Sequence, residues 1–193
     1  MNYDLIAIGG SWGGTTAVGR VLGGVSDEVD EPIVVVLHRG TDAPEGALIT
    51  TLQQHARRRV AEVEDKDPIE RSRVYLAPVD YHLLVERGWF SLSVDERVHH
   101  ARPSIDVLFE SAAEAYGARV IGVILTGANE DGARGLAAIK AAGGVAVVQD
   151  PQTSERRRMP EAAIAATDAD AVLPIEDIPP FLYGLCCKPR VRV

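Results

Sequence analysis

The segment Leu5-Ile6-Ala7-Ile8-Gly9-Gly10-Ser11-Trp12-Gly13-Gly14 lies near the start of the 193-residue chain and decides its fold class. Its apolar residues run continuously instead of alternating with polar ones, which is typical of a strand buried on both faces of a parallel sheet. The glycines that follow predict a tight turn, because such a turn allows little side-chain bulk. The segment therefore predicts a strand–turn–helix unit of an α/β protein.

The same pattern recurs along the chain. Further strands are predicted at residues 33–37, 74–77, 120–125, 145–148 and 171–173, and helices at 13–22, 44–55, 104–116, 131–142 and 160–166. A stretch at 83–94 with Gly88 inside it predicts an antiparallel hairpin. We expect a doubly wound, mostly parallel α/β sheet of Rossmann-like order with helices on both faces. Residues 1–185 are predicted to form one domain, and residues 186–193 a short basic C-terminal tail.

Composition and charge restrict the class of protein. Apolar residues make up 46% and charged residues 25% of the chain, which is ordinary for a folded domain. The formal net charge of -8 disfavours a nucleic-acid partner. Two basic clusters, Arg57–Arg59 and Arg156–Arg158, are either solvated loops or a contact with an acidic partner surface.

The chain carries no sign of a disulfide framework, a leader or a membrane anchor. Its two cysteines, Cys186 and Cys187, are adjacent, which suits neither a disulfide framework nor a zinc site; their role stays open. No apolar stretch approaches the roughly 20 residues of a membrane helix, and no N-terminal signal is present. We expect a cytoplasmic protein with no membrane insertion, metal or cofactor.

Three polar residues follow strands whose carboxyl ends should meet at one edge of the sheet, where open α/β sheets bind their ligands. They are Ser11, His38 and Asp131. An alcohol, an imidazole and a carboxylate are the components of a nucleophile, a general base and an orienting acid. The sequence therefore predicts a hydrolytic triad at this edge.

Ser11 lies in a G-x-S-x-G sequence, which is the spacing of a nucleophile elbow. A serine at the start of a helix has free backbone N–H groups beside it. Such groups suit the oxyanion of ester hydrolysis, where one donor can be worth ~3 kcal/mol.

Two other interpretations of the glycine-rich turn are weaker. A dinucleotide-binding G-x-G-x-x-G is not matched, because Ser11 takes the place of the middle glycine and His38 stands where an acidic residue is expected. An α/β-hydrolase is disfavoured because its residues follow the order Ser, Asp, His.

Rivals exist for the base and the acid. His82 is a second candidate histidine and is expected at the pocket rim, whereas His55, His99 and His100 are expected to be solvated. An unperturbed imidazole pKa near neutrality suits His38 as a base.

Asp131 competes with Glu130 for the role of the acid. Asp131 is expected to open a helix, whose dipole would keep it ionised. It is preferred because the adjacent Gly132 permits close approach.

Six segments carry a resemblance to a known family. They read GGSWGG at 9–14, LH at 37–38, APVDYH at 77–82, RPSIDVLF at 102–109, LTGANEDGA at 125–133, and QDP through MP at 149–160. In combination, from about Asp4 to about Ile175, the chain resembles the catalytic domain of the chemotaxis protein-glutamate methylesterases, the CheB type.

The resemblance implies a function and a set of site residues. It implies that a Ser11–His38–Asp131 triad hydrolyses glutamyl methyl esters on the cytoplasmic helices of chemoreceptors, often with deamidation of glutamines. Backbone N–H groups near Trp12 and Ala128 would face the oxyanion, with His82 and Met159 beside the pocket. Many relatives carry an N-terminal receiver domain, so a separate receiver-domain regulator is a possible partner.

Three positions depart from the family pattern. Trp12 replaces a small residue, commonly threonine, and is expected to narrow the pocket; Ala128 replaces methionine, and Arg158 replaces glycine. Two alternatives therefore stay open. One is a binding or regulatory module of the same fold whose nucleophile is blocked by Trp12, and the other is an esterase with a non-chemotactic substrate.

Overall fold

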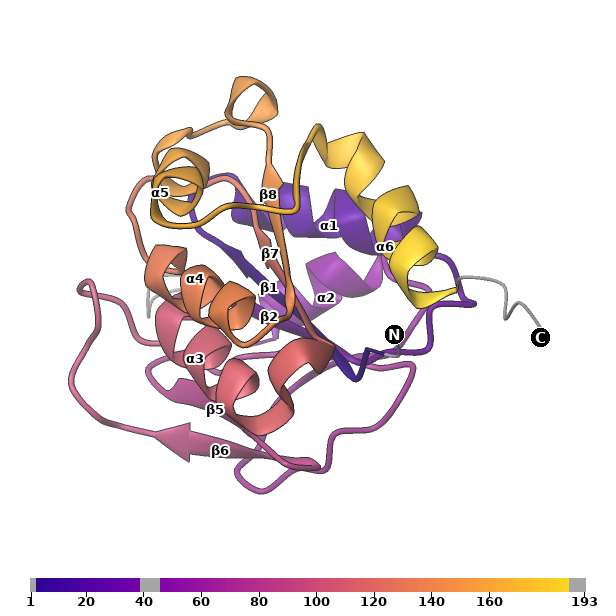
Figure 1. The fold of residues 1–193 in the computed structure, drawn as a ribbon. Helices are drawn as coiled ribbons and strands as arrows, with labels where there is room; N and C mark the ends of the chain where they lie inside the picture. The colour runs from indigo at the N-terminus through magenta and orange to yellow at the C-terminus, as the bar shows by residue number, and fades with distance from the viewer. Residues whose placement is uncertain (1–2, 39–45, 188–193) are drawn as a thin grey trace.

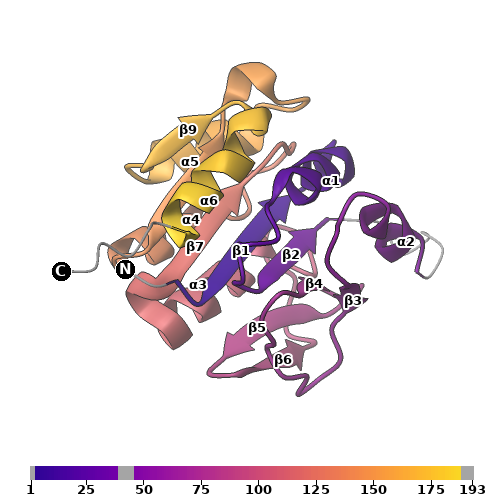
Figure 2. The same ribbon diagram turned by 90° about the vertical axis from the view of Figure 1, so that its right-hand side faces the viewer.

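The protein is built around a seven-stranded parallel sheet of order β3-β4-β2-β1-β7-β8-β9. The computed structural model describes residues 3–38 and 46–187. Strand β1 (Leu5–Gly10) lies at the centre, between β2 (Ile33–Leu37) and β7 (Val120–Ile124). The outer strands are β4 (Val74–Leu76), β3 (Val60–Glu62), β8 (Val145–Gln149) and β9 (Ala171–Leu173). The predicted α/β class with a mostly parallel sheet is confirmed (Figure 2).

Both faces of the sheet are covered, which is why the strand sequences are continuously apolar. Alternate residues of β1 point to opposite faces: Ile6 and Ile8 join one core cluster, and Leu5 and Ala7 join the other. Helices α1 (Gly14–Gly24), α2 (Ala47–Gln53) and α6 (Ile178–Cys186) cover the first face. Helices α3 (Ile105–Tyr116), α4 (Ala133–Ala141) and α5 (Arg158–Ala166) cover the second face (Figure 1).

The predicted antiparallel hairpin is present as β5 (His82–Glu86) and β6 (Trp89–Ser93). Gly88 in its turn has φ 91°, a conformation that glycine adopts without the Cβ penalty. Leu83, Val85 and Phe90 bury one face of the hairpin against the α3 side of the core.

Some element bounds differ from the prediction. Strand β3 was missed because it has three residues and is recognisable only by its pairing with β4. Helix α6 was not predicted; its first turn contains Pro179 and Pro180, and prolines are tolerated there. Cys186 ends α6 and so belongs to the helix, not to the predicted tail, and residues 188–193 lie outside the described part. The predicted start of the second helix at residue 44 also lies outside it.

The position of β1 in the sheet identifies where a ligand can bind. Strand β1 pairs with β2 on one side and β7 on the other, so the strand order reverses at its carboxyl end. This switch point is where open α/β sheets leave a crevice for ligands.

Within residues 3–38 and 46–187, no helix has the length and apolar character needed to cross a bilayer.

Candidate active site

The carboxyl ends of β1, β2 and β7 bring three loops together by backbone hydrogen bonds. The N–H of Ser11 donates to Thr126 O at 2.9 Å, and the N–H of His38 donates to Gly10 O at 3.2 Å. The glycine turn fits closely here, since a Cβ on Gly14 would lie 2.7 Å from Leu37 Cδ2. The three loops are therefore held in a fixed relation to one another.

Ser11 and His38 line the same cavity, which has a volume of about 390 Å³. The turn after Ser11 passes through Gly13, with φ 75°, before α1 begins. The other residues of the cavity wall are Arg97, His99, His100, Ala101, Arg102, Pro103 and Asn129.

His38 is held by a buried carboxylate. Its Nε2 lies 2.7 Å from Oδ2 of Asp131, whose side chain is fully buried. Its Nδ1 lies 3.3 Å from the side-chain nitrogen of Asn129. The two contacts fit a ring that carries its hydrogen on Nε2 and a lone pair on Nδ1. No hydrogen bond joins Ser11 to this ring in the described part of the chain, although both face one cavity.

Asp131 caps a helix that is not its own. Its Oδ1 accepts from the Ser104 hydroxyl at 2.7 Å and from the N–H of Asp106 at 3.1 Å, and its Oδ2 accepts from the N–H of Ile105 at 2.7 Å. The expectation that Asp131 opens its own helix is wrong, because α4 begins at Ala133. The carboxylate instead satisfies the free N–H groups at the start of α3.

This environment keeps Asp131 ionised. Burial is the largest single influence and acts to raise the pKa of the carboxyl. The hydrogen bond and positive charge of His38, with the bonds from Ile105 and Ser104, outweigh burial and lower the pKa below its ordinary value. The carboxylate is thus ready to orient the imidazole and to stabilise its positive charge.

Asp106 caps the start of α4, as Asp131 caps the start of α3. Its Oδ1 accepts from the N–H groups of Gly132 at 2.9 Å and Gly135 at 2.7 Å, so it caps α4 just behind Asp131. Its buried Oδ2 has no hydrogen-bond partner among the described residues and lies 3.3 Å from Nε2 of His99. Burial raises the pKa of Asp106; the Gly135 bond opposes this and the nearby Asp131 adds to it. His99 is exposed, as expected, and its ring also contacts this buried acid.

His99, Asp106 and Asp131 also have metal-ligand spacing, with ligand atoms within 4.8 Å of one another. However, the Asp131 oxygens already accept four hydrogen bonds. A cation would have to displace these bonds, so the cluster fits a hydrogen-bonded network better than a metal site.

Four predicted site residues do not line the cavity. His82, expected at its rim, is 2% exposed; its Nδ1 accepts from the N–H of Ser104 and its Nε2 contacts Glu96 O at 3.0 Å. It supports the start of α3 from behind. Met159 is also buried and packs against Gly127. Both residues shape the loops, and neither faces the cavity.

Trp12 and Ala128 are the other two predicted site residues that do not line the cavity. The Trp12 side chain is on the surface, where Nε1 donates to Glu155 Oε1 at 2.8 Å. The expectation that it narrows the pocket is therefore wrong, since its ring is directed to the Glu155 loop. Ala128 is exposed. The backbone N–H groups of Trp12 and Ala128 form no hydrogen bond with the described residues, which leaves them available as donors.

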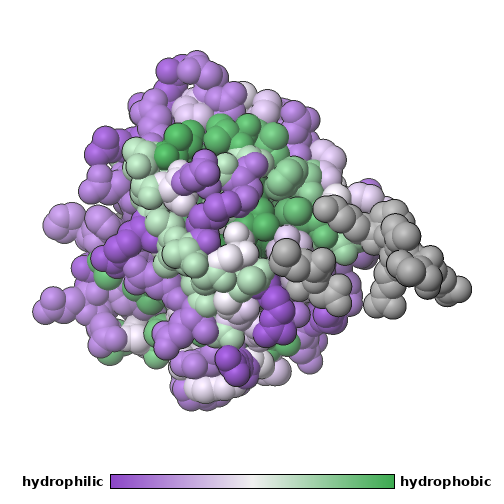
Figure 3. Space-filling view, in the orientation of Figure 1, coloured by the Kyte–Doolittle hydropathy of each residue, from purple (hydrophilic) through white to green (hydrophobic). Residues whose placement is uncertain are grey.

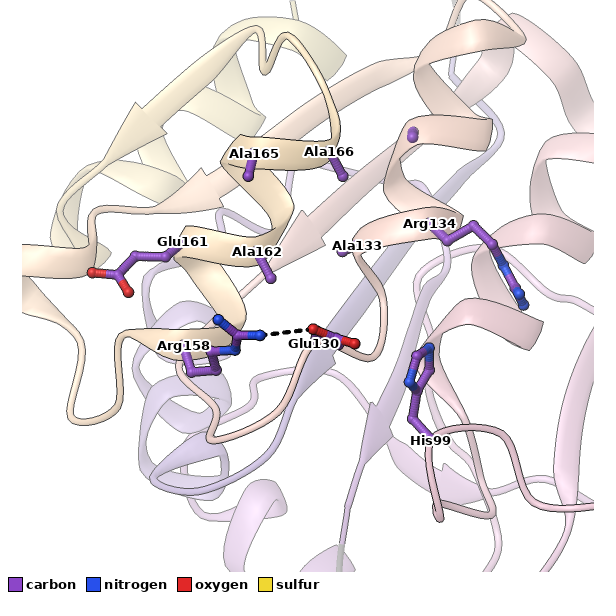
Figure 4. Close-up of a pocket in the computed structure, with 10 residues that line it drawn as sticks. His99, Glu130, Ala133, Arg134, Arg158, Glu161, Ala162, Ala165 and Ala166 are labelled. Atoms are coloured by element: carbon purple, nitrogen blue, oxygen red, sulfur yellow. Dashed lines mark hydrogen bonds and ion pairs between the residues drawn. The ribbon is translucent and has the colours of Figure 1, made fainter.

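The rival acid, Glu130, points elsewhere. It is exposed and pairs with Arg158 at 2.8 Å (Figure 4). This pair lies at one end of an alanine-lined groove of about 810 Å³ between α4 and α5. Thus Asp131 contacts the imidazole, and the departure at Arg158 affects the groove and not the cavity.

Sequence reasoning missed Ser104, Asp106, His99 and Asn129. The R-P-S-I-D segment was noted only for its resemblance, and a serine and an acid at a helix start were the available signal for a capping role. No local signal pairs His99 with Asp106.

Comparisons with known proteins agree with this geometry. A family model described as CheB methylesterase matches residues 6–182. A relative from Leptospira interrogans serogroup Icterohaemorrhagiae serovar copenhageni (strain Fiocruz L1-130) is 49% identical over 92% of each chain; its name assigns it provisionally to the protein-glutamate methylesterases/protein-glutamine glutaminases. Protein-glutamate methylesterase/protein-glutamine glutaminase 2 of Anaeromyxobacter dehalogenans (strain 2CP-C) is 41% identical over 94% of this chain and 53% of its own length.

A solved structure agrees with the whole fold. The crystal structure of the Thermotoga maritima CheB methylesterase catalytic domain matches with a TM-score of 0.88 and 32% identity, over 96% of this chain and 100% of that one. Sequence, topology and relatives point the same way, and the chain belongs to the CheB methylesterase family.

Proposed function

We propose that this protein hydrolyses γ-methyl esters of glutamate residues in a protein substrate and that Ser11, His38 and Asp131 carry the reaction. The contact between His38 and the buried Asp131, on a cavity that Ser11 also lines, is the observation that supports it most directly. Membership of the CheB methylesterase family and the names of the relatives support the substrate class.

In the first half of the reaction, Nδ1 of His38 accepts the hydroxyl proton while Ser11 Oγ attacks the ester carbonyl. Nδ1 first exchanges its contact with Asn129 for one with Ser11. Asp131 stabilises the imidazolium that forms. The free N–H groups of Trp12 and Ala128 are the candidate donors to the tetrahedral oxyanion, each worth about 3 kcal/mol.

The second half restores the enzyme. His38 returns its proton to the departing methoxide, so methanol leaves and an acyl-serine remains. Water then attacks the acyl carbon while His38 takes one of its protons. His38 gives this proton to Ser11 Oγ as the acyl bond breaks, which releases a glutamate carboxyl group and restores the serine hydroxyl. The same sequence with ammonia as the leaving group deamidates a glutamine.

The proposed substrates are the methylated cytoplasmic helices of chemoreceptors. A receiver-domain protein on a separate chain is the proposed regulator, and the cytoplasm is the proposed compartment. Membership of the CheB methylesterase family supports these proposals.

The Ser11→Ala variant tests the proposal. It should abolish methanol release from a methylated receptor and lose labelling by a serine-directed fluorophosphonate, while its thermal unfolding stays within a few degrees of the parent. Ser26→Ala is the matched control, because Ser26 follows α1 at the opposite end of the sheet. Undiminished turnover in Ser11→Ala would exclude the mechanism.

A further inference from the structure

The hydrolytic mechanism leaves two features of the sequence unused: the side chain of Trp12, whose backbone N–H is a candidate oxyanion donor, and the basic cluster Arg156–Arg158. The structure places one member of the cluster on the tryptophan: the Arg156 guanidinium lies over the Trp12 ring, 5.1 Å from its centroid. Arg157 follows it in the chain and is exposed, with its guanidinium 2.9 Å from Gln152 Oε1. We propose that Trp12, Arg156 and Arg157 form a docking platform for an acidic segment of the protein substrate that flanks the ester. This inference rests on the proposed function and adds to it the chemistry of the substrate.

Trp12 has the properties of a recognition anchor. Its side chain is 57% exposed and lies next in sequence to the proposed nucleophile. Glu155 holds the indole nitrogen at 2.8 Å and Arg156 covers one face of the ring. Tryptophan and arginine are enriched among residues that dominate protein interfaces, and a fixed side chain loses little entropy on binding.

The platform is mechanically coupled to the nucleophile. The Thr126 hydroxyl donates to Trp12 O at 3.0 Å and accepts from the N–H of Arg156 at 2.8 Å. The backbone of the same threonine accepts from the N–H of Ser11. A substrate segment seated on the platform is therefore held in register with the cavity, as orientation of an ester at a nucleophile requires.

The charges on the platform favour an acidic segment. Arg156 and Arg157 are exposed and form no ion pair with a carboxylate within the described residues, whereas Arg158 and Arg134 pair with Glu130 and Glu110. Among residues 3–38 and 46–187, Glu155 is the only carboxylate bonded to the platform, through Trp12 Nε1. The chain as a whole carries -8, so a local positive site must supply the attraction for an acidic partner.

The occupant is a polypeptide and not a nucleic acid or a lipid surface. A glutamyl ester that enters the cavity is attached to a main chain, and that chain must pass over the residues around Ser11. The net charge of -8 opposes binding to a nucleic acid or to an anionic lipid surface.

Two synthetic peptides test the platform. Both carry one glutamyl γ-methyl ester; one has aspartate and glutamate at the flanking positions, and the other has asparagine and glutamine. We expect the wild type to hydrolyse the acidic peptide with a kcat/KM at least about tenfold higher at 50 mM salt. The preference should fade near 1 M salt, because screening then acts within about 3 Å.

Charge reversal in the protein gives the decisive comparison. Arg156→Glu should lose or invert the preference, and because the preference is a ratio within one variant, a general loss of activity does not affect it. Lys66→Glu is the matched control: Lys66 is also exposed and lies 4.0 Å above the ring of Trp89, outside the cavity wall. It should keep the wild-type preference.

A binding measurement separates the two proposals. In Ser11→Ala with Trp89→Phe, Trp12 is the remaining tryptophan, and its fluorescence should change when the acidic peptide is added and not with the neutral one. Equal rates on both peptides, or an unchanged preference in Arg156→Glu, would overturn the platform while leaving the esterase intact. If the wild type hydrolyses neither peptide, the proposed function fails, and an unchanged Trp12 fluorescence would then remove the platform as well.

Discussion

At the scale of single residues, Asp131 and Asp106 form a pair with opposite electrostatic settings. Asp131 accepts from the start of α3, the helix that contains Asp106, and Asp106 accepts from Gly132 and Gly135 around the start of α4, the helix that follows Asp131. Asp131 also has His38 beside it, which lowers its pKa, whereas burial raises the pKa of Asp106. The capping therefore fixes the loop that carries Asp131, and the imidazole favours the ionised form of that carboxyl.

Asp131→Asn should lower kcat for methanol release by a factor on the order of 10³–10⁴, because an amide cannot stabilise the imidazolium or keep its tautomer. Steady-state kinetics with a methylated receptor measure this. Asp150→Asn is the control, since Asp150 likewise follows a strand and caps a short turn through the N–H of Gln152. A kcat within threefold of wild type would contradict the role given to Asp131.

The same substitution should change the acid end of the stability curve. A lowered folded-state pKa makes ionised Asp131 stabilising above its unfolded value near 3.9, and this stabilisation is lost as pH falls through the folded value. The excess free energy of unfolding of wild type over Asp131→Asn should therefore shrink as pH is lowered through 4. Urea denaturation at a series of pH values measures it.

Asp106→Asn should behave in the opposite way. Its amide oxygen can still accept from Gly132 and Gly135, while the charge is removed. A raised folded-state pKa means that the folded protein retains a proton which the unfolded chain has lost. The free energy of unfolding of the wild type therefore falls as pH rises above about 3.9. The stability of Asp106→Asn relative to wild type should increase from pH 3 towards neutrality. A difference that is flat over this range would show that Asp106 is not perturbed.

At the scale of elements, the loop between β7 and α4 depends on one glycine. Gly132 has φ 95°, and a Cβ there would lie 2.5 Å from Ile124 Cδ1 and 2.6 Å from Ile105 Cγ2. The loop can approach α3 closely enough for Asp131 to cap it only because this side chain is absent.

Gly132→Ala should therefore cost about 2–4 kcal/mol, combining the penalty for positive φ with overpacking, and should lower kcat because Asp131 moves. Gly88→Ala isolates the penalty for positive φ, because Gly88 has φ 91° but nothing lies within 4 Å of the position that a Cβ would take. We expect about 1–2 kcal/mol for that control and no loss of kcat. Equal costs for the two substitutions, from chemical denaturation, would show that the close packing at Gly132 is relieved easily.

At the scale of the whole molecule, α6 is part of the domain. Leu182 is fully buried in the core on the α1 side of the sheet. In the view of Figure 3 most of the surface is hydrophilic and apolar residues gather in its upper part, whereas the side chain of Leu182 is buried. The last helix thus closes the sheet face on which α1 carries the glycine turn.

Leu182→Ala should destabilise the protein by about 2–5 kcal/mol, because it removes buried methylenes and leaves a cavity. Ile164→Ala on α5 is the control: Ile164 is 39% exposed, and a change within about 0.5 kcal/mol is expected. Thermal and urea unfolding followed by circular dichroism compare the two. If Leu182→Ala unfolds like its control, α6 is a peripheral helix.

The local pattern of the chain determined the class of sheet and the residues at its carboxyl edge. Continuous apolar runs such as those before Gly9 and His38 are required wherever a strand is covered on both faces, so they are visible in one dimension. Parallel strands send their carboxyl ends to one edge, which is why Ser11, His38 and Asp131 could be brought together without coordinates. Elements without such a pattern, β3 and α6, were not predicted.

Tertiary structure alone decided how these groups are used. The ring nitrogen of His38 that faces Asp131, 93 residues away in the chain, depends on the packing of three loops. That Asp131 caps α3, that His99 pairs with Asp106, and that the Trp12 ring turns out to Arg156 depend equally on contacts between distant segments. Sequence periodicity specifies which face of an element is buried, but side-chain direction and pairing are set by neighbours that only the folded chain supplies.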